Sequence, residues 1–179
     1  MTSTMSSNRS VLVNGGGSLL GSHVVHLLRS RGRRAIVLDE PTDDLAIVQG
    51  IVNDNKLDAV IHIGTVCSVV LKACEDTESL CWSAIHHDGN DEICMGLIPR
   101  AIDAALRRGP PLVVFGADHP TPDGTIIRDY IDVEDLAAAH LAALDIVETG
   151  RTVGPVDLGN GVGHSVLEVM DAVEEVLGC

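Results

Sequence analysis

Short aliphatic runs alternate along the chain with longer segments in which apolar residues recur at helical spacing. The runs predict strands at residues 11–14, 35–39, 59–63, 112–115, 126–131 and 156–158. The spacing predicts helices at residues 19–30, 97–108 and 133–148, after Asp43 or Asp44, after Ser165, and over part of residues 67–84. This alternation predicts an α/β fold, a doubly wound parallel sheet with right-handed crossovers.

Residue types at the helix ends support several of these elements. Asp132 is suited to cap the helix at residues 133–148, and Ser165 with Glu168 has the spacing of a capping box. Gly109 and the prolines after it predict the end of the helix at residues 97–108.

A glycine cluster joins the first predicted strand to the first predicted helix. The segment VLVNGGGSLLGSHVVHLLRSRGRRAIVLD, residues 11–39, has the layout of a dinucleotide-binding βαβ unit. In such a unit glycines permit a tight turn and bring backbone N–H groups to a pyrophosphate. Ser18 is a flaw in the motif, because it stands where the middle glycine belongs whether the count to Gly21 starts at Gly15 or at Gly16. Its side chain either weakens phosphate binding or donates its hydroxyl to a phosphate oxygen.

Asp39, at the end of the second predicted strand, indicates which dinucleotide is bound. A carboxylate at this position accepts hydrogen bonds from both ribose hydroxyls and repels a 2′-phosphate. We therefore predict a Rossmann-like domain with NAD, rather than NADP, as its cofactor.

Composition and charge narrow the possible partners. The chain is 45% hydrophobic but 2% aromatic, so its core is aliphatic, which suits a buried parallel sheet. A net charge of −14 argues against nucleic acid, and no apolar run is long enough to span a membrane. We interpret the basic cluster at residues 29–34 as the solvated end of a helix.

The cysteine count suggests a reducing compartment. Five cysteines without a CxxC pair predict free thiols and a cytoplasmic location. Residues 1–9 lack an apolar signal segment, and we expect them to form a disordered leader. We predict no metal site, and interpret the following residues as buried thiols or as part of a loop: Cys67, Cys74, Cys81, His86, His87 and Asp88.

Several blocks in the same order resemble one family. The run FGADHPTPDGTIIRDYIDVEDLAAAHLAAL at residues 115–144 is similar to a block of the UDP-glucose 4-epimerases, members of the extended short-chain dehydrogenase/reductase family. DAVIHIG at residues 58–64, the glycine turn, and VDLGNGVGHSVLEVMDAVEEVLG at residues 156–178 resemble further blocks of that family.

This resemblance implies a UDP-glucose 4-epimerase-like isomerase of galactose and nucleotide-sugar metabolism that holds NAD as a hydride carrier. Arg128 matches an arginine that the family places on the diphosphate of a UDP-sugar, although an ion pair with Asp129 or Asp132 is the alternative. Lys72 matches a lysine near the nicotinamide, and a different alignment places Cys67 there. The cofactor residues implied are Gly15, Gly16, Ser18, Leu19, Leu20, Gly21, Asp39 and Lys72.

The family's catalytic Tyr-x-x-x-Lys motif is absent from these 179 residues. The one tyrosine, Tyr130, is followed four residues later by Glu134, and the lysines are Lys56 and Lys72. We therefore assign no catalytic residue. His62, His140 or Cys67 would have to carry the proton, and no motif supports any of them.

The resemblance also implies internal deletions. We expect a single, incomplete NAD-binding domain over residues 10–179, with remnants of the substrate-binding part at about residues 93–135. The family's dimer-forming helices fall in the shortened region, which leaves a homodimer open. The sequence thus predicts an impaired or inactive pseudoenzyme, with a non-catalytic NAD-binding paralogue or a decayed gene product as the alternatives.

Overall fold

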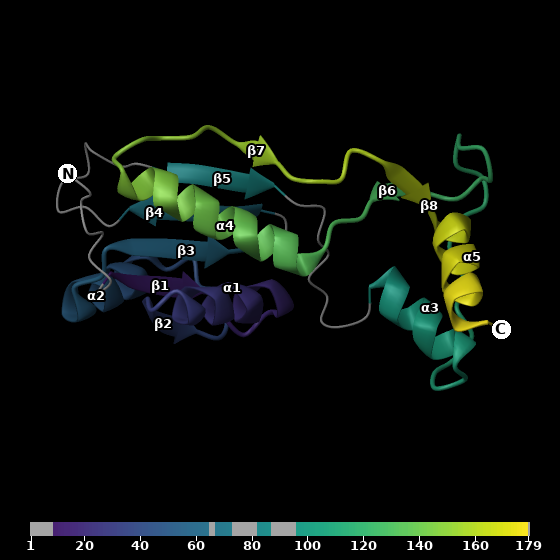
Figure 1. Ribbon diagram of the computed structural model, residues 1–179, viewed down its shortest axis with the longest axis horizontal. Coiled ribbons are helices and arrows are strands. Elements are labelled where there is room, and N and C mark those ends of the chain that lie inside the picture. Colours follow the sequence, from purple (N-terminus) through teal and green to yellow (C-terminus); the bar gives the residue numbers. More distant parts are fainter. Residues whose placement is uncertain (1–8, 65–66, 73–81, 87–95, 179) are drawn as a thin grey trace. The chain divides into compact units, whose positions relative to one another are not determined.

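The structure is a computed structural model that describes residues 9–64, 67–72, 82–86 and 96–178, with the backbone alone described for residues 67–72 and 82–86. It divides into two compact units, the first formed by Met1–Gly89 and Asp132–Leu158 and the second by Asn90–Ile131 and Gly159–Cys179. The prediction of one domain over residues 10–179 stays a prediction. Figure 1 labels the elements along the chain.

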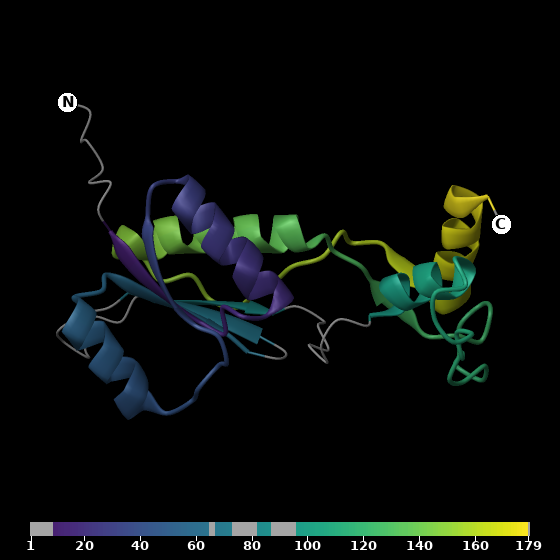
Figure 2. The ribbon, with the colours of Figure 1, turned by 90° about the horizontal axis from the view of Figure 1, so that it is seen from below.

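The first unit is a mixed sheet with helices on both faces. Its strands follow the order β2-β1-β3-β4-β5-β7, in which β1 pairs in parallel with β2 and β3, and β5 pairs in parallel with β7. Figure 2 shows α1 and α4 on one face of the sheet and α2 on the other. The elements are β1 (Ser10–Asn14), α1 (Leu19–Ser30), β2 (Arg34–Leu38), α2 (Leu45–Asn55), β3 (Ala59–Ile63), β4 (Cys67–Lys72), β5 (Trp82–His86), α4 (Val133–Glu148) and β7 (Val156–Asp157).

The α/β class and the parallel dinucleotide-binding half are confirmed, but the middle of the sheet differs from the prediction. The helix expected within residues 67–84 is wrong, because β4 and β5 lie there and pair antiparallel with β3 and with each other. Only residues 64–66 separate β3 from β4. A parallel connection needs a crossover of about a dozen residues, so this short link forces β4 to run back along β3.

Aliphatic side chains from both faces of the sheet form the core. Leu12 and Val60 pack against Leu57 and the inner side of α2, while the opposite face meets α1 and α4. The following residues are less than 2% exposed: Val11, Leu12, Val13, Val24, Leu28, Ile61, Leu141, Leu144 and Val147. Burial of each such side chain stabilises the unit by about 1.5–3 kcal/mol before conformational entropy is counted.

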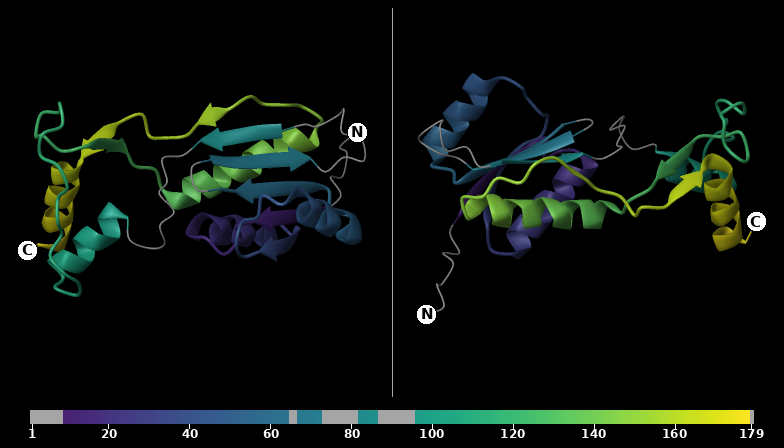
Figure 3. Two further views of the ribbon diagram at one scale, coloured as in Figure 1. Left: turned by 180° about the vertical axis from the view of Figure 1, so that it is seen from behind. Right: turned by 90° about the horizontal axis from the view of Figure 1, so that it is seen from above.

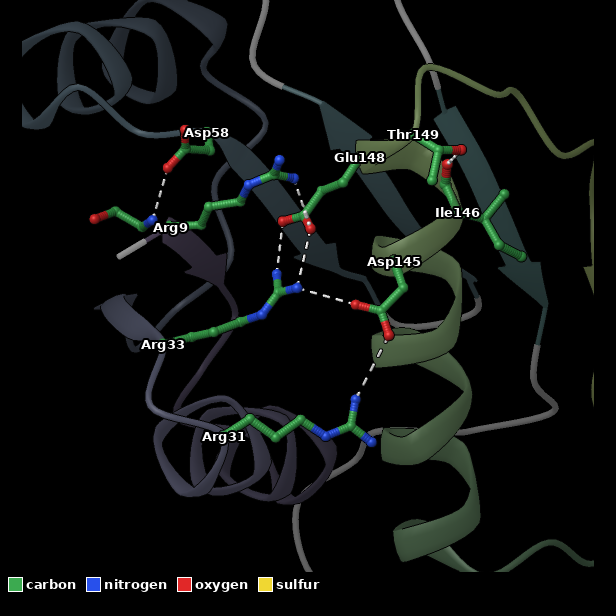
Figure 4. Close-up of polar contacts among 9 residues, drawn as sticks. Arg9, Arg31, Arg33, Asp58, Asp145, Ile146, Glu148 and Thr149 are labelled. Atoms are coloured by element: carbon green, nitrogen blue, oxygen red, sulfur yellow. Dashed lines mark hydrogen bonds and ion pairs between the residues drawn. The ribbon is translucent and has the colours of Figure 1, made fainter. Parts of the chain in front are cut away.

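A network of ion pairs connects the C-terminal end of α4 to arginines that lie before β1 and between α1 and β2. Arg33 donates two hydrogen bonds to Glu148, of 2.6 and 2.9 Å, and one of 2.9 Å to Asp145 (Figure 4). Arg9 lies 3.0 Å from Glu148, whose side chain is 2% exposed, and Arg31 lies 3.8 Å from Asp145. The interpretation of this basic cluster as a solvated helix end is therefore wrong for Arg33, which is 14% exposed.

The second unit contains α3 (Leu97–Ala105), β6 (Ile127–Asp129), β8 (Gly163–Ser165) and α5 (Val166–Leu177). β6 pairs antiparallel with β8, α3 packs against α5, and Figure 3 shows these elements from two further directions. The capping box of Ser165 and Glu168 is present as predicted. The strand expected at residues 112–115 is wrong: this segment is irregular, and Val113 and Phe115 are 57% and 78% exposed, so it lacks the burial that favours a strand there.

Candidate functional site

The turn between β1 and α1 is closed by backbone hydrogen bonds to the end of β2. The N–H groups of Gly15 and Gly16 donate to the carbonyl of Leu38 at 2.9 and 2.8 Å, and Gly17 donates to the carbonyl of Asp39 at 3.0 Å. The glycine turn, residues 15–21, is thus held directly against the residue predicted to bind the ribose.

Glycine is required at several positions of this turn because other backbone lies close by. Gly15 has φ +95°, and a Cβ atom there would lie 2.6 Å from the carbonyl oxygen of Ile63. A Cβ on Gly21 would lie 2.2 Å from the carbonyl oxygen of Gly15, and one on Gly17 would lie 2.8 Å from that of Asp39. Gly17, which the motif count left aside, therefore allows the approach of Asp39.

Ser18 caps α1 rather than facing outward as a phosphate donor. Its hydroxyl donates to the carbonyl of Gly15 at 2.9 Å and accepts the N–H of Gly21 at 3.0 Å. Because the single hydroxyl proton is engaged, it is not available to a phosphate oxygen at the same time. The serine in place of the middle glycine thus has a structural use that neither sequence-based alternative included.

The first turn of α1 leaves two backbone donors open. Within the described part of the chain, the N–H groups of Leu19 and Leu20 have no hydrogen-bond acceptor, whereas Ser22 donates to the carbonyl of Ser18 at 2.9 Å. Open N–H groups at the positive end of a helix dipole favour an anion, and a phosphate group fits this need. The two leucine side chains lie in different environments, because that of Leu20 is buried and that of Leu19 is exposed.

Asp39 lies at the end of β2 with its side chain exposed, as a ribose-binding acid requires. Its carbonyl is fixed by Gly17, and the residue before it, Leu38, is fixed by Gly15 and Gly16. The backbone of Asp39 is therefore hydrogen-bonded to the glycine turn that leads into Leu19 and Leu20.

A polar cluster lies where β1 and β3 end, and motif counting did not find it. Asn14 Nδ2 lies 2.8 Å from the carbonyl of Thr42 and 2.8 Å from His62 Nδ1, and Asn14 Oδ1 accepts the N–H of Thr42 at 2.9 Å. His62 Nε2 lies 3.6 Å from a carboxylate oxygen of Asp43. We call Asn14, Thr42, Asp43 and His62 the loop clamp. This cluster could have been found in the sequence from the polar residues at the ends of two predicted buried strands, Asn14 and His62.

The register of β4 bears on the two alternatives for the residue near the nicotinamide. Lys72 pairs with Ala59 at the start of β3, whereas Ser68 pairs with Ile63 at its end. The backbone of Lys72 is therefore about 10 Å along the strand from the level of His62 and the glycine turn. The cofactor role expected for Lys72, and the alternative that places Cys67 there, stay predictions.

Arg128 lies in the second unit, on β6 opposite His164 of β8. The carboxylate of the neighbouring Asp129 accepts the N–H groups of Asn160 and Gly161 at 2.9 and 2.7 Å. Arg128 has a polar interaction of its own. The resemblance-based role of Arg128 stays a prediction.

Tyr130 follows β6 and lines an apolar pocket of about 380 Å³ in the second unit. Burial raises the pKa of the Tyr130 hydroxyl, with a smaller opposing effect from Arg128. A tyrosine that acts as a proton carrier near neutral pH needs the opposite shift. The remaining pocket residues include Ile98, Ile102, His164, Glu168, Val169, Val173 and Val176.

Within the described ranges, no group of three or more His, Cys, Asp or Glu side chains could hold a metal ion. His86 is in β5, and His87, Asp88, Cys74 and Cys81 lie outside the described residues. In that same part of the chain, no helix is long and apolar enough to cross a membrane.

Comparison with known proteins identifies relatives of part of the chain. Residues 83–159 match the NAD dependent epimerase/dehydratase family. A UDP-glucose 4-epimerase of Rhizobium meliloti (strain 1021) is 52% identical over 80 residues, which are 44% of this chain and 24% of that protein. A UDP-glucose 4-epimerase of Drosophila melanogaster is 46% identical over 86 residues, 46% of this chain and 24% of that protein. The matched part thus spans about a quarter of each of these curated relatives.

Solved structures of similar fold extend over most of the chain. A UDP-glucose 4-epimerase from Brucella ovis in complex with NAD superposes with a TM-score of 0.72 at 22% identity, covering 93% of this chain and 82% of that one. A UDP-glucose 4-epimerase from Bifidobacterium longum in complex with NAD⁺ and UDP gives a TM-score of 0.70 at 21% identity, covering 94% and 83%. At this level of identity the likeness establishes the Rossmann-like fold.

Proposed function

We propose that this chain, which is related to the UDP-glucose 4-epimerases of the NAD dependent epimerase/dehydratase family, binds NAD at the glycine turn without efficient epimerase turnover. The observation that carries the proposal is the pair of open N–H donors at Leu19 and Leu20, which follow a glycine turn that is hydrogen-bonded to the backbone of the exposed Asp39. A dinucleotide has the matching groups, a pyrophosphate and a ribose diol.

The residues present fit this cofactor. Gly15, Gly17 and Gly21 keep the turn free of side chains where the backbone approaches most closely. Leu19 and Leu20 would hold the pyrophosphate through their N–H groups, and Asp39 would hold the ribose hydroxyls. Bound NAD supplies a carbon that accepts and returns a hydride. The carboxylate of Asp39 favours NAD over NADP because it repels a 2′-phosphate.

Proton transfer is the step for which we assign no residue among the side chains that the structure describes. The tyrosine and lysines of the chain do not form the Tyr-x-x-x-Lys pair, and burial raises the pKa of Tyr130. His62 Nδ1 is engaged by Asn14, and the His140 ring is fully buried with Nδ1 2.7 Å from the carbonyl of Leu136. General acid–base catalysis contributes about 10²–10⁴-fold, so we expect turnover to be slower by at least that factor than in a complete epimerase.

The same proposal covers the substrate, the cellular location and the oligomeric state of the protein. Arg128, aligned by resemblance with a diphosphate-binding arginine, would contact a UDP-sugar, and a planar guanidinium suits such a group. A cytoplasmic location stays the prediction made from the cysteines. A homodimer is left open by the proposal.

The binding site is tested by titrating NAD⁺ and NADP⁺ into the wild-type protein and into Asp39→Asn and Asp54→Asn variants, by isothermal calorimetry. Asp54 is an exposed acid of α2, so its variant controls for the lost charge. We expect wild type and Asp54→Asn to prefer NAD⁺, and Asp39→Asn to bind it about tenfold more weakly, the loss expected for a charged hydrogen-bond acceptor. Equal NAD⁺ affinity in Asp39→Asn would contradict the assigned site.

A further inference from the structure

The side-chain amide of Asn14 is fully used at the end of β1. Its oxygen accepts the N–H of Thr42, and its nitrogen faces both the carbonyl of Thr42 and Nδ1 of His62. Asn14 is 1% exposed, so water does not replace these partners. The clamp therefore depends on all three contacts being made by groups of the correct polarity.

The backbone of Thr42 fixes which way the amide points. The N–H of Thr42 donates to the Asn14 oxygen, and the carbonyl of Thr42 accepts from the Asn14 nitrogen. A flip of the side-chain amide by 180° would therefore lose both hydrogen bonds. Asn14 Nδ2 is thus a donor toward His62, and Nδ1 of His62 must be the acceptor. The proton of a neutral His62 is then on Nε2, which faces Asp43 at 3.6 Å.

The clamp determines the path of the segment that carries Asp39. At one end of this segment Leu38 and Asp39 accept N–H groups of the glycine turn, and at the other end Thr42 makes two hydrogen bonds to Asn14. Between these ends, Pro41 lies beside Gly15, where a Cβ would be 3.4 Å from the proline Cβ. Release of Thr42 would free one end of the segment next to the ribose-binding acid.

We propose that Asn14 is a positioning residue for the nucleotide site, which holds Asp39 through the Thr42 segment, and that protonation of His62 releases this hold and weakens NAD binding. The inference rests on the proposed function and adds a pH response to it. A protonated His62 carries a hydrogen on Nδ1, which then faces the Asn14 NH₂ as a second donor.

The groups around His62 do not compensate for this loss. Asp43 is the charged group at ion-pair distance in the described structure, and its side chain is 99% exposed, so its attraction for a protonated His62 is screened by water. From β1 the neighbour is Asn14, and from β4 it is the backbone of Val69. His62 itself is 24% exposed, so a lost partner there is felt more than on the surface.

The test compares NAD⁺ affinity between pH 8.5 and pH 6.0, a range in which imidazoles gain a proton and ordinary carboxylates do not. Wild type should bind about fivefold more weakly at pH 6.0, the effect of one net hydrogen bond. His23 is also close to the turn, with Nδ1 2.8 Å from the carbonyl of Leu19. His62→Gln separates the two histidines, because glutamine offers an uncharged acceptor to Asn14 and should flatten the pH response.

Asn14→Asp gives the sharper result. Its second carboxylate oxygen faces the carbonyl of Thr42, another acceptor, so binding at pH 8.5 should be about tenfold weaker than in wild type. At pH 6.0 the protonated His62 donates to that oxygen, so affinity should rise as wild-type affinity falls. Asn53→Asp, an exposed change of the same type on α2, should keep the wild-type slope.

The outcomes separate the two proposals. Absence of NAD⁺ binding by wild type at any pH overturns the proposed function, and the inference with it. Wild-type binding with the same pH slope in His62→Gln overturns the inference alone, and this variant decides the matter if Asn14→Asp does not fold. Parallel slopes for wild type and folded Asn14→Asp also overturn it.

Discussion

Gly15 shows, at the scale of single residues, how closely the nucleotide turn is built against β3. Its φ of +95° disfavours any side chain, and its Cα faces the carbonyl of Ile63 from a distance that leaves no room for a Cβ. Ser18 shows the converse, because a residue that breaks the glycine pattern caps α1 by accepting the N–H of Gly21 and also donates to the carbonyl of Gly15. Backbone contacts therefore explain which residue occupies each position of the glycine turn better than the spacing of the motif does.

Gly15→Ala should destabilise the first unit by about 2–4 kcal/mol, because strain at positive φ and steric overlap add. Gly150→Ala is the matched control, since Gly150 has φ +81° but nothing within 4 Å of its added Cβ. That control should cost only about 1 kcal/mol. Urea unfolding of the two variants measures the difference, and equal costs would show that the Ile63 contact has no effect.

Asp123 gives a pH prediction for the second unit. Its pKa is lowered from the ordinary 3.8, first by the hydrogen bond that Ser165 donates and then by the N–H of Thr125. As pH falls, the unfolded chain takes up the proton first. The stabilisation is therefore complete above about pH 3.8 and is lost as pH falls through the lower folded-state pKa.

Asp123→Asn should lower the urea midpoint at pH 7, and the gap to wild type should narrow by pH 2.5, because protonation of Asp123 removes its stabilising contribution as pH falls below about 3.8. Far-UV circular dichroism at both pH values measures it. Asp118→Asn, an exposed change in the same loop, serves as the control. A gap that is the same at pH 7 and pH 2.5 would refute the ionic role of Asp123.

At the scale of elements, α4 is fixed to the first unit by charge as well as by apolar packing. Glu148, at the last turn of α4, is paired with Arg33 and Arg9 although its side chain is nearly inaccessible. Removing one member of a buried pair leaves a desolvated charge without a partner, which is the costly case. The two arginines precede Glu148 by more than a hundred positions in sequence, so the pairing joins the two sequence segments of this unit.

Glu148→Ala should destabilise the protein by about 3 kcal/mol, whereas Asp145→Ala should cost at most about 1 kcal/mol because Asp145 is half exposed. The double variant Arg33→Met with Glu148→Leu should recover most of the loss. Chemical denaturation of all three decides the matter. A loss for Asp145→Ala as large as for Glu148→Ala would mean that burial is not the cause.

Several elements could be predicted from sequence, and others could not. The bounds of α4 and the capping box of α5 follow from the local caps Asp132 and Ser165, and those of α1 follow from the helical spacing of its apolar residues. The antiparallel β4 and β5 and the absence of a strand at residues 112–115 depend on which strand partners are available, which no local signal shows. The loop clamp and the Arg33 network likewise join residues far apart in sequence.

At the scale of the whole molecule, the two units carry different parts of the proposed chemistry. The first unit has the turn, the acid and the clamp for a nucleotide, and the second has Arg128 and Tyr130. What the 179 residues lack is the Tyr-x-x-x-Lys pair. The similarity to UDP-glucose 4-epimerases could be inferred from sequence blocks, whereas the engagement of Ser18 by backbone and of His62 by Asn14 needed the structure.

Calorimetric titration of NAD⁺ into the purified wild-type protein at pH 8, followed by incubation of the same sample with UDP-galactose, tests the central claim most directly. We expect saturable one-site binding of NAD⁺, a melting temperature that rises with NAD⁺ concentration, and UDP-glucose formation at least about 10²-fold slower than in a complete epimerase. Absence of binding, or UDP-glucose formed at a rate typical of enzymes, about 1 s⁻¹ or more, would contradict this claim.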